Sequence, residues 1–183
     1  MNAVGIIPVR LESSRLPNKA ILDIYGLPMF VHTCKRALLA ETLDEVFLAT
    51  DNKKIAEIAN KHNIKVIMTS TTHKNSTERI AEACEKIDCD IIVNIQGDEA
   101  LVKPQHIDAA VTMMLENPTI NVGILVNKYF KENNIKRTGD WRIWLKTIVM
   151  FTIFLAPYFL IKNRFNIIFV VTPNIDLYKM SLC

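Results

Sequence analysis

At residues 90–99 the chain reads Asp90-Ile91-Ile92-Val93-Asn94-Ile95-Gln96-Gly97-Asp98-Glu99. The first half of this stretch is rich in β-branched apolar residues, which is typical of a strand buried on both faces of a sheet. The second half is a polar turn that contains a glycine and two acids. A buried strand with polar groups at its carboxyl end predicts an open parallel sheet with a ligand site at that edge.

The same alternation continues on both sides of this stretch. Other apolar runs predict strands over 3–8, 46–49, 64–68 and 120–126. Apolar residues at helical spacing predict helices over 28–41, 76–87 and 104–115, and one more that Asp51 caps. Short strands that alternate with amphipathic helices predict a three-layer α/β/α sandwich with a mostly parallel sheet for residues 1–137.

Composition divides the chain into two unequal parts. Residues 1–137 carry 17 basic, 17 acidic and five aromatic residues, whereas residues 138–183 carry five basic, two acidic and nine aromatic residues. The formal net charge of +3 therefore comes entirely from the second part. We expect one α/β domain over 1–137, followed by an atypical apolar and aromatic tail over 138–183.

Several partner classes are disfavoured by the sequence. A net charge of +3 is too small to indicate a nucleic-acid partner. The first residues lack the pattern of a signal peptide, and the four cysteines contain no C-x-x-C pair, so we expect a cytoplasmic protein with free thiols. The uncharged run 147–161 would span only about 22 Å as a helix and contains Pro157, so a membrane anchor is disfavoured.

The segments that leave the carboxyl ends of the predicted strands are polar: 9–19, 50–52, 69–79 and 96–99. The first places Arg10, Arg15 and Lys19 within ten residues, a pattern that suits a polyphosphate. This loop lacks the glycine pattern of a P-loop, and a solvated basic loop is the alternative interpretation.

The turn at Asp98 indicates a second kind of chemistry. A carboxylate just beyond a buried strand is a typical oxygen ligand for Mg²⁺, which also takes phosphate oxygens. A simple capping turn is the alternative. Between the two loops, Asn75 or Ser76 is predicted to cap a helix from whose first turn Arg79 projects toward the strand ends.

Taken together, these segments resemble the cytidylyltransferases that activate 3-deoxy-manno-octulosonate (KDO). Residues 6–19 resemble the P-A-R-x-x-S-x-R-x-P-x-K loop of that family, and 73–79 resemble its H-x-S/N-G-T-D/E-R segment. Residues 92–99 resemble its V-N-x-Q-G-D-E-P turn, and 26–29 and 49–51 also match in order and spacing. The resemblance extends over residues 3–127 and implies a fold like that of the nucleotide-diphospho-sugar transferases.

The resemblance implies Mg²⁺-dependent transfer of CMP from CTP to KDO, which gives CMP-KDO and pyrophosphate for lipopolysaccharide synthesis. Arg10, Lys19 and Asp98 would be the catalytic residues, and Asp98 would bind Mg²⁺. Gln96 would contact the sugar acid. The CTP-binding set implied by position is Arg10, Ser13, Arg15, Lys19, Thr77 and Arg79. Family members form homodimers, an assembly that we do not carry over to this shorter chain.

The sequence also departs from the family pattern. Asn18 and Ser76 stand where glycine is usual, and Ala100 stands where proline is usual. The family pattern is not continued after Asn127. The family's later V-D-T-P-E-D-L segment, whose Asp is a second metal ligand, has only a faint counterpart in which Val171 replaces that Asp, and we interpret this likeness as chance.

Three alternatives therefore remain open at this stage. The composition of 138–183 is typical of an AT-rich gene translated out of frame, which predicts a frameshifted or truncated product that binds nucleotide without turnover. A related sugar acid, an acylneuraminate or an 8-amino-KDO, is the alternative substrate. A membrane-associated interaction protein that uses residues 143–171 is the third hypothesis.

Overall fold

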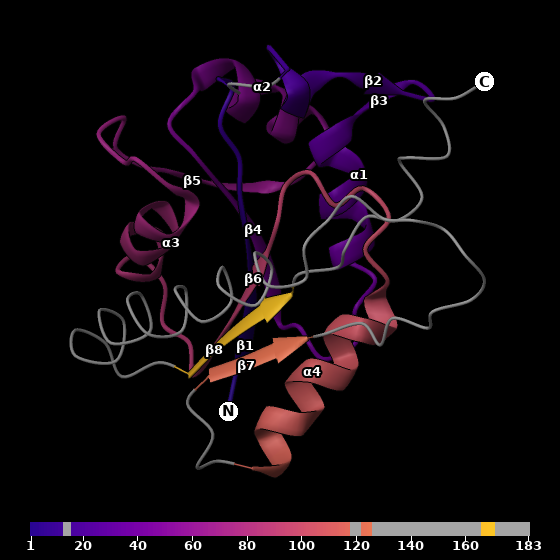
Figure 1. The fold of residues 1–183 in the computed structure, drawn as a ribbon, viewed down its shortest axis with the longest axis vertical. Coiled ribbons are helices and arrows are strands. Elements are labelled where there is room, and N and C mark those ends of the chain that lie inside the picture. The colour runs from indigo at the N-terminus through magenta and orange to yellow at the C-terminus, as the bar shows by residue number, and fades with distance from the viewer. Residues whose placement is uncertain (13–15, 118–121, 126–165, 171–183) are drawn as a thin grey trace, which may run out of the picture.

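Parallel strand pairing dominates the structure, a computed structural model that describes residues 1–12, 16–117, 122–125 and 166–170. The described elements, in chain order, are β1 (Ala3–Pro8), η1 (Lys19–Ile21), β2 (Asp23–Ile24), β3 (Leu27–Pro28), α1 (Met29–Ala37), β4 (Glu45–Thr50), α2 (Lys53–Lys61), β5 (Lys65–Met68), α3 (Ser76–Cys84), β6 (Ile91–Ile95), α4 (Pro104–Glu116), β7 (Val122–Leu125) and β8 (Asn166–Val170). The main sheet has the strand order β5-β4-β1-β6-β8-β7, and β2 and β3 form a separate hairpin (Figure 1).

Every neighbouring pair in the main sheet is parallel. β1 lies between β4 and β6, with Gly5 level with Val46 on one side and with Val93 on the other. All six residues of β1 are buried, as expected for a strand covered on both faces. The predicted α/β class with a parallel sheet is therefore confirmed.

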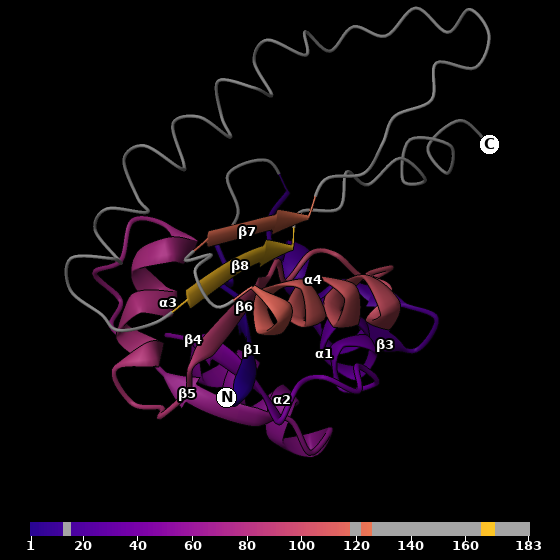
Figure 2. The same ribbon diagram turned by 90° about the horizontal axis from the view of Figure 1, so that it is seen from below.

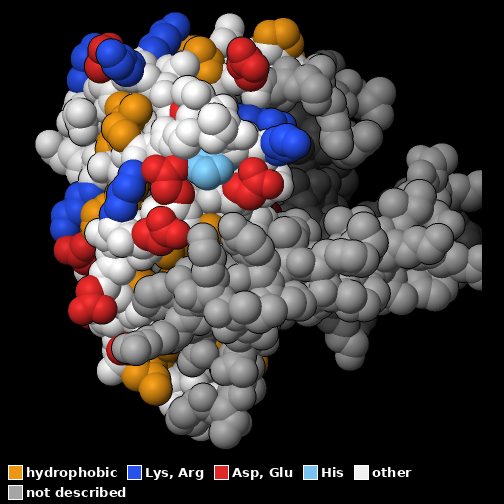
Figure 3. Space-filling view, turned by 90° about the vertical axis from the view of Figure 1, so that its left-hand side faces the viewer, with side chains coloured by type: hydrophobic (Ala, Val, Ile, Leu, Met, Phe, Trp, Pro, Cys, Tyr) orange, Lys and Arg blue, Asp and Glu red, His pale blue; other side chains and the backbone are white. Residues whose placement is uncertain are grey.

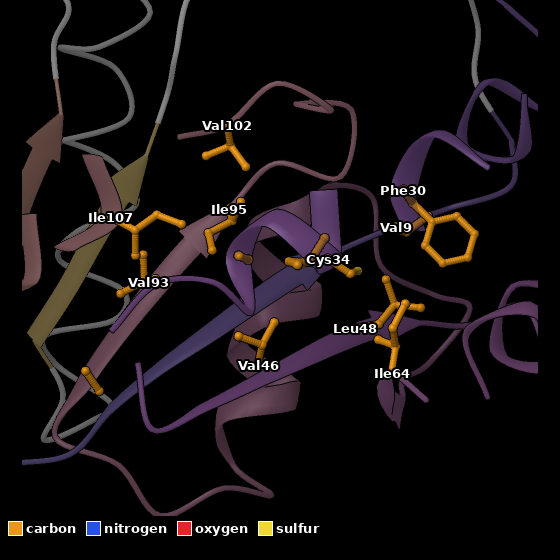
Figure 4. Packing of buried hydrophobic residues seen from close by; sticks show 14 of the residues in the cluster. Val9, Phe30, Cys34, Val46, Leu48, Ile64, Val93, Ile95, Val102 and Ile107 are labelled. Carbon is orange, nitrogen blue, oxygen red and sulfur yellow. The ribbon is translucent and has the colours of Figure 1, made fainter. Parts of the chain in front are cut away.

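Helices cover both faces of the sheet, which gives the predicted three layers. Figure 2 shows α3 on one side of the strands and α1 and α4 on the other. Side chains alternate along β6 accordingly: Val93 and Ile95 join the core beneath α1 and α4, whereas Ile92 joins the core beneath α3. The larger core includes Phe30, Leu48 and Ile107 (Figure 4).

The cysteines of the described residues are free and buried. Cys34 packs in the larger core, and burial raises the pKa of its thiol to about 12. Cys84 and Cys89 pack in the core beneath α3, where burial also raises the pKa of each thiol. These cysteines are therefore protonated packing residues rather than nucleophiles or metal ligands.

One predicted helix cap is wrong. Asn52, not Asp51, is the N-cap of α2, because the Asn52 backbone is extended and its side chain accepts hydrogen bonds from the Lys54 and Ile55 amides. Asp51 lies one residue earlier and its carboxylate pairs with Arg79 instead. The cap position therefore shifts by one residue, and the predicted cap becomes part of the polar edge of the sheet.

The sheet also contains a strand that the sequence analysis did not predict. β8 comes from the segment 138–183, which we placed outside the α/β unit, yet it pairs in parallel with both β6 and β7. Val170 is level with Ile95 on β6 and with Leu125 on β7. The run Asn166-Ile167-Ile168-Phe169-Val170 has the apolar, β-branched character that such an inner position requires.

No helix within the described segments has the length and apolar character needed to cross a membrane. The uncharged run 147–161 lies outside those segments, as does most of the tail.

Candidate functional site at the carboxyl edge of the sheet

An open pocket of about 510 Å³ lies at the carboxyl ends of β1 and β6 and the N-terminus of α3. Three of the polar segments that the sequence analysis selected meet there: 8–10 with Lys19, 73–76, and 96–98. The pocket-lining residues include four Lys or Arg side chains and two acids, Glu12 and Asp98. A pocket with more positive than negative charge suits a polyanionic ligand such as a triphosphate.

The close approach of two loops builds the centre of this pocket. A Cβ atom on Gly97 would lie 2.6 Å from Val9 Cγ2 and 2.9 Å from the Pro8 carbonyl oxygen. Only glycine therefore lets the turn after β6 pack against the end of β1. This steric contact is the structural reason for glycine at position 97.

Lys19 and Asp98 form an ion pair across the pocket. Lys19 Nζ lies 2.5 Å from Asp98 Oδ2, and the side chains are 35% and 50% exposed. Asn18 precedes Lys19 in the left-handed region with φ 56°, which explains why glycine is usual at this position and why asparagine is tolerated. The backbone turn at Asn18 thus places the Lys19 ammonium next to the turn after β6.

Arg79 is the most buried cation of the site. Its side chain is 5% exposed, Nη2 donates to Asp51 Oδ2 at 2.8 Å, and Nη1 donates to Thr69 Oγ1. These partners come from the ends of β4 and β5, so Arg79 joins two strand-end segments at one edge of the sheet. The expected projection of Arg79 toward the strand ends is confirmed, and its contact with the nucleotide stays a prediction.

The N-terminus of α3 is capped as predicted. The Asn75 side chain accepts from the Glu78 amide at 2.9 Å, and Glu78 in turn accepts from the Asn75 side chain at 2.8 Å. Ser76, which replaces the usual glycine, is the first residue of α3 and does not have a positive φ. Backbone strain is therefore no objection to serine here.

The remaining predicted residues have different environments. Gln96 lines the pocket, and its Nε2 donates to Asn94 Oδ1 at 3.1 Å. Thr77 is 2% exposed, and its hydroxyl has no hydrogen-bond partner among the described residues. Ser13 and Arg15 lie outside the described residues. The structure therefore brings together Arg10, Lys19, Arg79, Gln96 and Asp98 in one pocket, and the roles of all eight residues stay predictions.

The carboxylates of the site could hold a metal ion only if substrate and water supplied the remaining ligands. Within the ranges that the structure describes, no group of three or more His, Cys, Asp or Glu side chains is placed to hold a metal. Asp98 is one of the two acids that line the pocket, and its carboxylate is half-exposed. This arrangement fits Mg²⁺, which commonly takes one or two carboxylates and completes its shell with substrate phosphates and water.

Four residues of the pocket and its wall were not predicted: the lining residues Glu12, His73 and Lys74, and Glu82, which contacts His73. His73 and Lys74 lie inside the segment that we selected, so their position at the sheet edge was available as a signal. Glu82 lies two turns into α3, and its contacts with the preceding loop depend on tertiary structure.

A parallel α/β sheet with a basic pocket at its carboxyl edge is the arrangement of a nucleotide-binding protein. The sequence profile of the family described as "Cytidylyltransferase" matches residues 4–146. The chain belongs to this family.

Curated relatives agree with this assignment. The chain is 42% identical over 128 residues to a 3-deoxy-manno-octulosonate cytidylyltransferase of Geobacter sulfurreducens, a match that covers 70% of this chain and 51% of that protein. It is 47% identical over 110 residues to a protein of the same name from Chlorobium phaeobacteroides, a match that covers 60% of this chain and 44% of that protein. The chain thus spans about half the length of the curated relatives that it matches.

Solved structures show the same fold. A CMP:2-keto-3-deoxy-manno-octonic acid synthetase complexed with CTP matches with a TM-score of 0.66 and 36% identity over 68% of this chain and 52% of that one. A cytidylyltransferase from Leptospira borgpetersenii matches with a TM-score of 0.63 over 94% of this chain and 76% of that one. At 21% identity, the second match supports the fold alone.

Proposed function

We propose that the chain transfers CMP from CTP to KDO in a Mg²⁺-dependent reaction that releases pyrophosphate and supplies CMP-KDO for lipopolysaccharide synthesis. The observation that carries the proposal is the meeting of Arg10, Lys19 and Asp98 in one pocket of a cytidylyltransferase fold. The relatives' names supply the choice of KDO.

In this reaction the anomeric hydroxyl of KDO attacks the α-phosphorus of CTP. A bond forms between that oxygen and phosphorus, the bond to the bridging oxygen breaks, pyrophosphate leaves with the electron pair, and the hydroxyl proton passes to solvent. Arg10 and Lys19 neutralise charge on the β- and γ-phosphates, which stabilises the leaving group. Asp98 would hold Mg²⁺, which would supply further positive charge beside the phosphates.

The other residues act in binding. Gln96 lies at the same edge as Asp98 and contacts the sugar acid, whereas Thr77 and Arg79 help to form the cytidine site. Ser13 and Arg15 support the triphosphate. No covalent enzyme intermediate is needed, because alignment of the two substrates supplies much of the rate enhancement. The buried, free thiols of Cys34 and Cys84 agree with a cytoplasmic location.

Two measurements test the proposal. CTP should raise the melting temperature of the chain more than ATP does, because binding to the folded state stabilises it. Mass spectrometry should detect CMP-KDO after incubation with CTP, Mg²⁺ and KDO. CMP transfer to an acylneuraminate or 8-amino-KDO in preference to KDO would show that this sugar acid, rather than KDO, is the substrate. CTP binding without any product would favour a nucleotide-binding protein without turnover, and absence of CTP binding would refute the proposal.

A further inference from the structure

The segment 69–75 connects β5 to α3 and forms one wall of the pocket. His73, Lys74 and Asn75 from this segment line the pocket together with Arg10 and Asp98. The segment has no regular secondary structure, so side chains elsewhere must fix its position.

Glu82, two turns into α3, makes the contacts that fix this wall. Its Oε2 accepts a hydrogen bond from the Ser70 amide at 2.7 Å and lies 2.6 Å from His73 Nε2. Its Oε1 accepts from Lys86 Nζ at 2.8 Å, and Lys86 also donates to the Met68 carbonyl oxygen at 2.7 Å. One carboxylate therefore joins α3 to two positions of the segment, Ser70 and His73.

Glu78, one turn earlier on the same helix face, adds a second attachment. Its Oε2 accepts from the Lys74 amide at 2.9 Å and lies 3.9 Å from His73 Nδ1. Figure 3 shows a histidine surrounded by acidic side chains on one face of the molecule. Glu78 also belongs to the helix cap, whereas the bonds of Glu82 to the segment serve no cap.

The Glu82 carboxylate stays ionised over the working range of pH. Hydrogen bonds from Lys86, and then from the Ser70 amide, lower its pKa to about 2 from the ordinary value of 4.5. Hydrogen bonds to an ionised acceptor are stronger than those to a neutral one. The attachment is therefore present at neutral pH.

We propose that Glu82 is a positioning residue that holds residues 70–75 in the conformation that binds the nucleotide. The inference rests on the proposed function, because it assigns the wall 73–75 to the CTP pocket. Glu82 is absent from the pocket lining and acts through Ser70 and His73.

The physical consequence is a change in the population of binding-competent molecules. Without Glu82 the segment samples other conformations, and the observed Kd for CTP rises by the inverse of the competent fraction. The loss of two hydrogen bonds to a partly exposed carboxylate predicts about a tenfold rise for Glu82→Ala. Glu82→Gln keeps an acceptor for the Ser70 amide and should give about a threefold rise.

Two readouts on the full chain test the inference: CTP affinity by calorimetry and hydrogen exchange of the amides of residues 70–75. The control is Glu57→Ala, which removes a helical glutamate at an exposed position of α2. We expect faster exchange at 70–75 in both Glu82 variants without nucleotide, no change in the control, and recovery of protection at saturating CTP. A purely structural role would instead raise exchange throughout α3 and would not recover.

The outcomes separate the two levels of the proposal. If the wild-type chain binds no CTP, the proposed function fails. If the wild-type chain binds CTP and both Glu82 variants bind it within twofold of wild type, only the positioning role is refuted. Unchanged exchange at residues 70–75 in Glu82→Ala would refute it as well.

Discussion

Replacing Lys19 with methionine should strengthen the binding of a divalent metal to the nucleotide-free chain. In the structure the Lys19 ammonium lies 2.5 Å from Asp98 Oδ2 and competes with any cation for that carboxylate. Both side chains are partly exposed, and pairs of this kind are worth about 0.2–1 kcal/mol. Removing the ammonium should therefore tighten metal binding by about 1.5- to fivefold.

Electron paramagnetic resonance of Mn²⁺ titrated into the chain without nucleotide measures this affinity directly. Lys54→Met on α2 is the matched control, since it removes an exposed lysine that does not line the pocket. Asp98→Asn should weaken Mn²⁺ binding. With CTP present the effect of Lys19→Met should reverse, because the triphosphate then loses a cation. Mn²⁺ affinity that is equal in the wild type, Lys19→Met and Asp98→Asn would refute the assignment of Asp98.

Three further predictions concern packing and charge. Gly97→Ala should lower the free energy of unfolding by about 1–3 kcal/mol and weaken CTP binding, because the added Cβ meets Val9 and the Pro8 carbonyl. Chemical denaturation and calorimetry measure the two effects, and unchanged values would contradict the close approach of the two loops. In a urea titration, Leu48→Ala should lower the free energy of unfolding by about 2–5 kcal/mol, since Leu48 is fully buried. The control Leu39→Ala, at a 68% exposed site, should lower it by less than about 0.5 kcal/mol. The difference in the free energy of unfolding between wild type and Glu82→Gln should be largest above pH 4.5 and shrink as the pH falls toward 2, because the folded-state pKa of Glu82 lies below its ordinary value. A difference that grows on acidification would contradict this sign.

Local sequence patterns predicted most of the sheet because each strand is a short apolar run between polar segments. The predicted strand over 3–8 coincides with β1, and the run at 90–95 corresponds to β6. Helix starts were predicted where the cap is local, as at Asn75. The Asp51 cap was wrong by one residue, because Asp51 and Asn52 are both good caps and only the tertiary pair with Arg79 distinguishes them.

Features that depend on distant segments could not be predicted in the same way. β8 enters the sheet between β6 and β7, although 40 residues separate it from β7 in the chain. The lone run 166–170 gives no indication of its partners, and its surroundings differ in composition from the first 137 residues. The attachment of the pocket wall by Glu82 is also tertiary, because it joins a helix to the loop that precedes it.

Much of the candidate site followed from topology. Polar segments after parallel strands must gather at one edge of the sheet, and this places Arg10, Lys19 and Asp98 in one pocket. Their mutual geometry required the structure: the steric need for Gly97 and the ion pair between Lys19 and Asp98 are contacts between loops that lie far apart in the sequence.

Pyrophosphate release by the purified chain with CTP, Mg²⁺ and KDO is the most direct test of the proposed cytidylyltransferase activity, with Asp98→Ala as the comparison. We expect release that requires KDO and that Asp98→Ala loses. Equal release from both proteins would contradict the role of Asp98, and absence of release from the wild-type chain would contradict the proposed activity.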